Sequence, residues 1–213
     1  MRSRSCNTSF LAVTILCLLA LSQVACATRL REVGLPLPKP APVHGSPLPI
    51  SAALVIGPQF ANHVLHHTDQ EWVTFFRIHA GPYASAKLRA LATSSFANSF
   101  IVEQLSELPS RGQHVDYALV PAFTSFALAS PPVHAYQDAY LEVAITVRIL
   151  DGESREIATL AASGFAEGTF GRGGANVDRL AMMALDNMCE NVWHQVLDIL
   201  RRQPSKALQL TPQ

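Results

Sequence analysis

Residues 139–151, AYLEVAITVRILD, decide the fold that this sequence predicts. Every second side chain in the stretch is apolar: Leu141, Val143, Ile145, Val147 and Ile149. Alternation with a period of two is typical of a β-strand that has one face on a core and the other face in water. We therefore expect Ile145 to be buried and Thr146 to face solvent.

The stretches on both sides of this strand predict further strands of the same sheet. Asp151-Gly152 predicts a turn, and residues 155–166 return as a strand, which completes a hairpin. Residues 116–128, DYALVPAFTSFAL, are apolar on both faces, which favours a central strand. Pro121 has no N–H group to donate, so this strand needs a bulge or an unpaired position there.

Two amphipathic helices are predicted further from the hairpin. One begins at Gly81-Pro82, and its apolar stripe reaches Phe96. The other begins at Asn176, which is expected to cap it, and reaches Arg202. Both helices present one apolar face, so both are expected to pack on the same core.

The remaining strand predictions are residues 51–57 and 100–103, while residues 60–78 are ambiguous and residues 72–79 are compatible with a further strand. The order of elements predicts an α/β (α+β) fold, in which a two-layer sandwich has a mostly antiparallel sheet with two amphipathic helices on one face. The other face of the sheet, with Glu142, Thr146 and Arg148, is expected to be open to solvent or to a partner.

Residues 1–25 predict a signal peptide, with Arg2 and Arg4 before an apolar run that is short for a membrane span. A small residue directly before Cys26 resembles the lipobox of bacterial lipoproteins, although Gln23 stands where that pattern has an apolar residue. The resemblance implies that Cys26 is lipidated and anchors the chain in the outer membrane on its periplasmic side. The alternative is cleavage after Ala27, which would leave the protein in the soluble periplasm.

The rest of the domain organisation follows from composition. Residues 26–50 hold six of the fourteen prolines and predict a proline-rich tether, followed by a single periplasmic domain at 51–202 and a flexible tail at 203–213. Cys189 falls in a helical pattern and is expected to be a buried apolar side chain. Charged residues make up 15% of the chain and the net charge is zero, so the basic surface of a nucleic-acid-binding protein is missing.

Two patches are weak candidates for chemistry. His63, His66 and His67 are close in sequence, and on a helix His63 and His67 would have a spacing that zinc uses, but a polar surface segment is the simpler interpretation. The glycine-rich residues 164–174 predict a flexible loop before a helix N-terminus, where anions bind, yet they match neither the P-loop nor the dinucleotide motif. We therefore predict no catalytic residue, metal or cofactor, and a protein that is not an enzyme.

The order of these motifs resembles a known class of protein. The lipobox-like start, SAALVIG at 51–57, GPYASAKLRALATSSFANSF at 81–100 and DYALVPAF at 116–123 are similar to small periplasmic lipoprotein domains of Gram-negative bacteria. Among these, the architecture resembles the penicillin-binding-protein activators, the curli-secretion lipoprotein and the N-terminal domain of the Tol-system propeller protein. The resemblance covers residues 26–202 and implies a module that binds an envelope protein or serves in assembly, with a homo-oligomer as a further alternative. A periplasmic metal-binding or small-ligand-binding protein, or an enzyme, using the histidines or the glycine-rich residues, is the alternative function.

Overall fold

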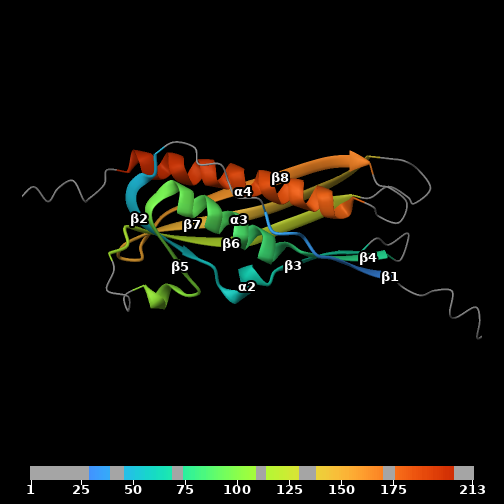
Figure 1. Ribbon diagram of the computed structural model, residues 1–213, viewed down its shortest axis with the longest axis horizontal. Coiled ribbons are helices and arrows are strands. Elements are labelled where there is room, and N and C mark those ends of the chain that lie inside the picture. The colour runs from blue at the N-terminus through green and yellow to red at the C-terminus, as the bar shows by residue number, and fades with distance from the viewer. Residues whose placement is uncertain are drawn as a thin grey trace, which may run out of the picture.

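The computed structural model describes residues 29–38, 46–68, 74–108, 114–129, 138–169 and 176–203. Its elements, in chain order, are β1 (Arg29–Val33), β2 (Leu48–Val55), α2 (Pro58–Ala61), β3 (Val64–Thr68), β4 (Thr74–His79), α3 (Ala80–Ser95), β5 (Phe96–Val102), η1 (Leu105–Glu107), β6 (Tyr117–Ala129), β7 (Asp138–Asp151), β8 (Glu156–Thr169) and α4 (Val177–Arg202) (Figure 1). The predicted signal peptide, Cys26 and residues 204–213 of the predicted tail lie outside the described residues. Among the helices that are described, none is long and apolar enough to cross a membrane.

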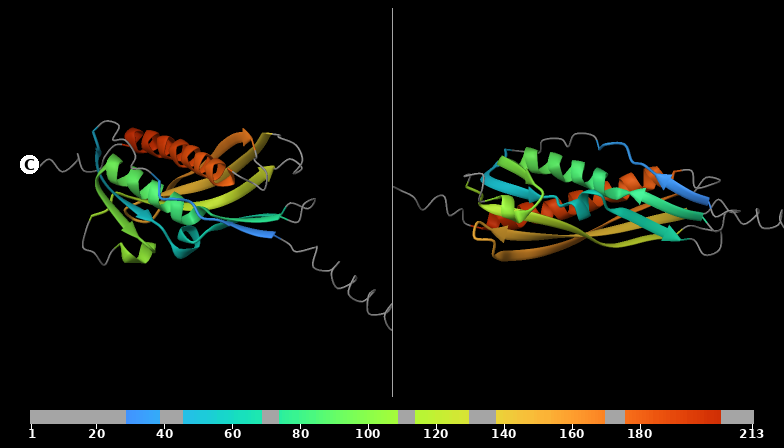
Figure 2. Two further views of the ribbon diagram at one scale, coloured as in Figure 1. Left: turned by 45° about the vertical axis from the view of Figure 1, so that its right-hand side comes forward. Right: turned by 90° about the horizontal axis from the view of Figure 1, so that it is seen from below.

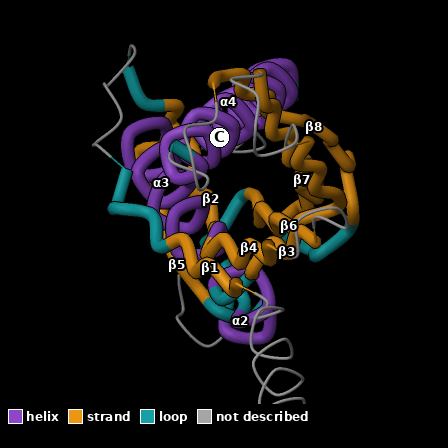
Figure 3. Tube along the Cα trace, turned by 90° about the vertical axis from the view of Figure 1, so that its right-hand side faces the viewer, coloured by secondary structure: helices purple, strands orange, loops and turns teal. Residues whose placement is uncertain are grey.

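The strands form two sheets, one of five strands in the order β5-β2-β6-β7-β8 and one of three strands in the order β1-β4-β3. The longest pairings, β6 with β7 and β7 with β8, are antiparallel, whereas β2 pairs in parallel with β5 and β6. Both α3 and α4 lie on the same face of the larger sheet (Figure 2). The predicted mixed fold, with two helices on a mostly antiparallel sheet, is confirmed. The smaller sheet was not predicted, and viewed end-on it lies with the larger sheet and the helices around the main core (Figure 3). A second, smaller hydrophobic cluster consists of Ala53, Val55, Val102, Ala118 and Leu150.

Strand β7 has the alternation that its sequence predicts. Its five inward side chains are at most 2% exposed: Leu141, Val143, Ile145, Val147 and Ile149. Glu142 and Arg148 are exposed on the other face, and Thr146 between them is half-exposed. The core therefore lies between this sheet and the helices, on the side that the apolar residues define.

A close approach between α4 and β8 depends on Gly164. A Cβ atom at this position would overlap the carbonyl oxygen of Ala184 and the amide nitrogen of Met188, both in the backbone of α4. The absence of a side chain thus lets helix and strand backbones come together. This corrects the prediction of a glycine-rich loop, because residues 164–169 belong to β8 and Gly164 serves packing. Residues 170–175 lie outside the described residues.

The N-terminal part of the fold differs most from the prediction. Residues Arg29–Val33, within the predicted tether, form β1 and pair in parallel with β4. Val33 is only 5% exposed, and Leu35 packs against the same core. Strand β2 also begins before the predicted domain boundary, at Leu48. Since Figure 1 places β1 and the start of β2 at opposite ends of the molecule, the proline-rich residues connect two parts of one fold.

Two further local predictions have different outcomes. Pro121 stands beyond Leu119, the last residue through which β6 pairs with β2, so it occupies the unpaired position that a proline needs. The bulge in β6 falls later, between Phe123 and Ser125. Asn176 precedes α4 as predicted, but its backbone is left-handed with φ 82° and its side chain makes no capping hydrogen bond.

Candidate functional site

The outer face of β6, β7 and β8 is the broadest surface of the sheet without a covering helix, because α3 and α4 lie on the other side (Figure 2). Six side chains at its centre are all short, four of them exposed and two, Ala144 and Thr146, partly buried: Ala122, Ser125, Ala144, Thr146, Ala161 and Ser163. We call these six residues the small-residue face. Strand register holds them together, since Thr146 pairs with Ala122 and Ala161 while Ala144 pairs with Ser125 and Ser163. The face therefore has no large side chain and no charge at its centre.

Charged residues at one end of this face are paired with each other. Arg148 donates a hydrogen bond from Nε to Glu156 at 2.9 Å, and the Thr159 hydroxyl donates to the same carboxylate at 2.6 Å. The Thr159 hydrogen bond and then the one from Arg148 hold the pKa of Glu156 below its usual value. A partner that docks on the small-residue face would thus meet a neutralised border rather than an isolated charge.

The other end of the face carries an exposed aromatic pair. The rings of Tyr140 and Phe165 stack with their centroids 5.9 Å apart, and the two residues are 45% and 49% exposed. Large aromatic side chains are usually buried or placed at interfaces, so this exposed stacked pair is a candidate contact surface.

The free edge of the larger sheet at β8 is covered by polar side chains of α4. Asn187, Asn191 and Gln195 are spaced four residues apart and lie on one side of the helix. Their side-chain amides donate to the backbone carbonyls of Phe165 (2.9 Å), Ser163 (3.0 Å) and Ala161 (3.4 Å). Exposed strand edges are sites where another strand can add, so this amide ladder protects the β8 edge and leaves the outer face as the accessible surface.

The histidines do not form the predicted zinc spacing. His66 and His67 are consecutive residues of a strand, β3, and therefore point to opposite sides. His63 precedes the strand, and its ring stacks on Phe123 at 4.5 Å, where burial lowers its pKa first and the nearby His66 second. Within the described ranges, no group of three His, Cys, Asp or Glu side chains could hold a metal ion. The metal hypothesis assumed that His63 and His67 share a helix, and this assumption is wrong. Two nearby acidic residues, Asp69 and Glu71, lie outside the described residues.

A pocket of about 230 Å³ opens beside His63 and is lined by residues 63–66 and 123–126. This volume is below the roughly 300–1,000 Å³ that is typical of small-molecule sites. The pocket is therefore a weak candidate for ligand binding.

The charged and thiol groups between α3 and α4 contribute to the packing of the two helices. Lys87 of α3 is only 6% exposed and forms ion pairs with Asp186 (3.0 Å) and Glu190 (2.8 Å) of α4. Cys189 is fully buried beside them, and this burial raises the pKa of its thiol, which favours the unreactive protonated form. The burial of Cys189 confirms the prediction from its helical pattern, whereas the burial of Lys87 was not predicted.

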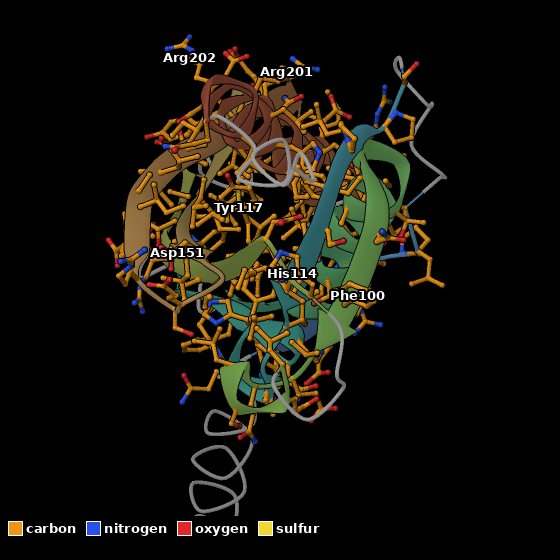
Figure 4. The ribbon with its side chains drawn as sticks, turned by 90° about the vertical axis from the view of Figure 1, so that its left-hand side faces the viewer. Phe100, His114, Tyr117, Asp151, Arg201 and Arg202 are labelled. Atoms are coloured by element: carbon orange, nitrogen blue, oxygen red, sulfur yellow. The ribbon has the colours of Figure 1, made fainter. Side chains whose placement is uncertain are left out.

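The end of the molecule opposite the start of β1 holds a polar cluster that includes His114, Tyr117 and Asp151 (Figure 4). Asp116 accepts a hydrogen bond from the backbone N–H of Ser51 at 2.7 Å and pairs with His114 at 3.0 Å. Arg155 binds Asp151 through two hydrogen bonds of 2.9 and 2.7 Å, which lower the pKa of that carboxyl. These contacts fix the β7–β8 turn and the start of β6.

Comparisons with known proteins concern the fold. No family model matches the sequence, and no curated protein is similar to it. A Xanthomonas campestris protein of the family of unknown function DUF330 superposes with a TM-score of 0.53 at 11% identity, covering 81% of this chain and 97% of that one. Uncharacterized lipoprotein B from Nitrosomonas europaea gives 0.47 at 14% identity, with 74% and 88% covered. A PelC variant from Paraburkholderia phytofirmans, solved as a dodecamer, gives 0.38 at 14% identity, with 72% and 93% covered.

At these identities the similarity concerns the fold alone, and the fold assignment rests on the first of the three structures. The structure thus shares its fold with a bacterial protein of similar size. The narrower resemblance to penicillin-binding-protein activators, the curli-secretion lipoprotein and the Tol-system domain stays a prediction, as does a homo-oligomer.

Proposed function

We propose that this protein is a lipid-anchored envelope protein that binds another envelope protein and does not catalyse a reaction. The observation that carries the binding role is the small-residue face, which is open and has neither large nor charged side chains at its centre. The predicted signal peptide and Cys26 support the anchored location on the periplasmic side of the outer membrane.

The chemistry of the small-residue face suits a protein partner better than a small ligand. Alanine loses almost no rotamer freedom when it is covered, and serine and threonine lose little, so burying this face costs little side-chain entropy. Short side chains also allow close approach of a partner backbone. A small ligand would need a concave pocket, which an open sheet face does not supply. Because the amide ladder protects the β8 edge, the partner is expected to dock on the face rather than add a strand there.

The anchor is tested by replacing its cysteine. We expect Cys26→Ser to move the protein from the membrane fraction to the soluble periplasmic fraction, because serine cannot carry the thioether-linked lipid. Cys6→Ser, within the predicted signal peptide, is the matched control and should leave the protein on the membrane. Fractionation followed by N-terminal sequencing reads the result. A wild-type protein that is already soluble and begins at Thr28 would show that the lipoprotein proposal is wrong.

The docking face is tested by cross-linking in intact cells. A photo-reactive residue at Ala161, on the small-residue face, should give a discrete cross-linked product, and the same residue at Thr93, exposed on α3, should not. Ala144→Arg places a long charged side chain at the centre of the face and should abolish the product while leaving the melting temperature nearly unchanged. An identical product from Thr93, or one that survives Ala144→Arg, would contradict docking on this face.

A further inference from the structure

We infer that the end of the molecule carrying the start of β1 rests directly on the bilayer, with Leu30, Tyr140 and Phe165 at the lipid–water interface. This inference rests on the proposed lipidation of Cys26. It adds an orientation and a contact surface that the anchor alone does not specify.

The length of chain between the anchor and the fold carries the argument. Strand β1 begins at Arg29, three residues after Cys26. Consecutive Cα atoms are 3.8 Å apart, so the first Cα atom of β1 lies at most about 11 Å from that of the lipidated cysteine. Strand β1 cannot serve as extra tether, because each of its residues pairs with β4 and Val33 is buried. The folded domain is thus held against the membrane surface.

Exposed apolar side chains lie at the end of the molecule that carries the start of β1. Large hydrophobic residues with high exposure within the described ranges are Leu30 (54%), Leu37 (77%), Tyr140 (45%), Phe165 (49%) and Met183 (42%). Leu30 is the second residue of β1 and Tyr140 the third of β7, while Phe165 lies near the end of β8. Figure 1 places these three strand ends at one end of the long axis, and Figure 3 shows that end facing the viewer.

This surface fits a lipid boundary. Tyrosine is enriched at membrane interfaces, where its ring lies among the headgroups and its hydroxyl stays hydrated. Apolar side chains near an acyl anchor add buried area to the attachment. The lipid bilayer would therefore cover the aromatic pair and Leu30, whereas the centre of the small-residue face lies further along the strands.

The proposed orientation also determines how the rest of the molecule stands relative to the bilayer. The strands of the larger sheet run along the long axis (Figure 1), and β7 has 14 residues, which span about 45 Å. The small-residue face would therefore stand upright from the bilayer, open sideways to a neighbouring protein. The polar cluster around Asp151 and Tyr117 would point away from the membrane (Figure 4).

The experiment measures which end meets lipid. Single cysteines replace Leu30 or Tyr140 at the proposed contact, and Arg155 in the β7–β8 turn serves as the control at the opposite end. Each is labelled with an environment-sensitive fluorophore in the purified lipidated chain. Cys189 should not react, because it is fully buried. The chains are reconstituted into vesicles of phosphatidylethanolamine and phosphatidylglycerol that contain a spin-labelled lipid as quencher.

We expect several-fold stronger quenching at positions 30 and 140 than at 155. A second chain, with a flexible Gly-Ser segment inserted after Thr28, should lose most of that difference, because the longer tether frees the domain from the surface. Equal quenching at both ends in a chain that floats with the vesicles would overturn the orientation alone. A chain that does not float at all would overturn the lipidation, and with it the orientation.

Discussion

Ile145→Ala is expected to lower the free energy of unfolding by about 2–5 kcal/mol, because it removes buried methyl and methylene groups and leaves a cavity. Ile145 is fully buried on the inner face of β7, with Phe123 of β6 and Ala162 of β8 as its register partners. Close packing on both sides leaves the surrounding side chains little room to fill the gap. Urea unfolding followed by circular dichroism measures the effect.

The neighbouring residue is the matched control for this substitution. Thr146 points to the outer face, where its hydroxyl has only a long contact of 3.5 Å to the Ala122 carbonyl. We expect Thr146→Ala to stay within about 0.5 kcal/mol of wild type, as exposed substitutions usually do. Equal costs at positions 145 and 146 would mean that both faces of the larger sheet are covered, which would contradict an open small-residue face.

The inner face of this sheet could be predicted from sequence because a single local rule decides it. In β7 the inward residues are apolar and the outward residues from Tyr140 to Arg148 are small, polar or partly polar, so period and burial agree there. Leu150, at the end of the strand, is an outward residue that is buried in a second hydrophobic cluster. A second local property placed Pro121 correctly, because the missing N–H group belongs to the residue itself. Predictions of this kind need no knowledge of which distant segment supplies the contact.

The parts that the sequence did not reveal depend on contacts with distant segments. Strand β1 is stabilised by pairing with β4 and by the burial of Val33, yet its sequence RLREV has little apolar character. Gly164 appeared to belong to a flexible loop, because glycine composition does not show whether a helix backbone will pack there. Strand β3 was not predicted, because its two histidines interrupt the apolar pattern of a short strand.

The candidate site was only partly predictable. The open outer face followed from the alternation in β7, and the small size of its residues is visible in the sequence once the register is known, as at Ala122, Ala144 and Ala161. The register across three strands is what the sequence does not specify. The amide ladder from α4 could be found only as a spacing of four residues, Asn187, Asn191 and Gln195, which is also typical of any solvated helix face.

The second prediction with a large effect on stability concerns the ion pairs of Lys87. The amine is nearly buried, and its charge is balanced by Asp186 and Glu190 across the contact between α3 and α4. Burial alone would lower the pKa of Lys87, but the hydrogen bonds that its ammonium donates to Glu190 and Asp186 outweigh this effect and raise the pKa. A raised pKa in the folded state means that the stabilising contribution is complete below the ordinary pKa of lysine and is lost only as the pH rises through the folded value. The pairs therefore stabilise the protein throughout the neutral range.

Removing both carboxylates leaves that buried charge without a partner. We expect the double variant Asp186→Ala, Glu190→Ala to lose about 3 kcal/mol at pH 7, the lower end of the roughly 3–5 kcal/mol for a broken buried pair, because solvent reaches the half-exposed carboxylate side. Asp198→Ala, which breaks an exposed 3.9 Å contact with Arg201 on the same helix, is the control and should cost less than about 1 kcal/mol.

A third variant separates the charge from the packing. Adding Lys87→Met to the double variant replaces the unpaired ammonium with an apolar side chain of similar length, so most of the lost stability should return. Thermal and urea unfolding of the three chains under the same buffer measure the difference. If the triple variant is no more stable than the double variant, the cost arises from lost helix contacts, such as the hydrogen bond between Tyr83 and Asp186, rather than from the buried charge of Lys87.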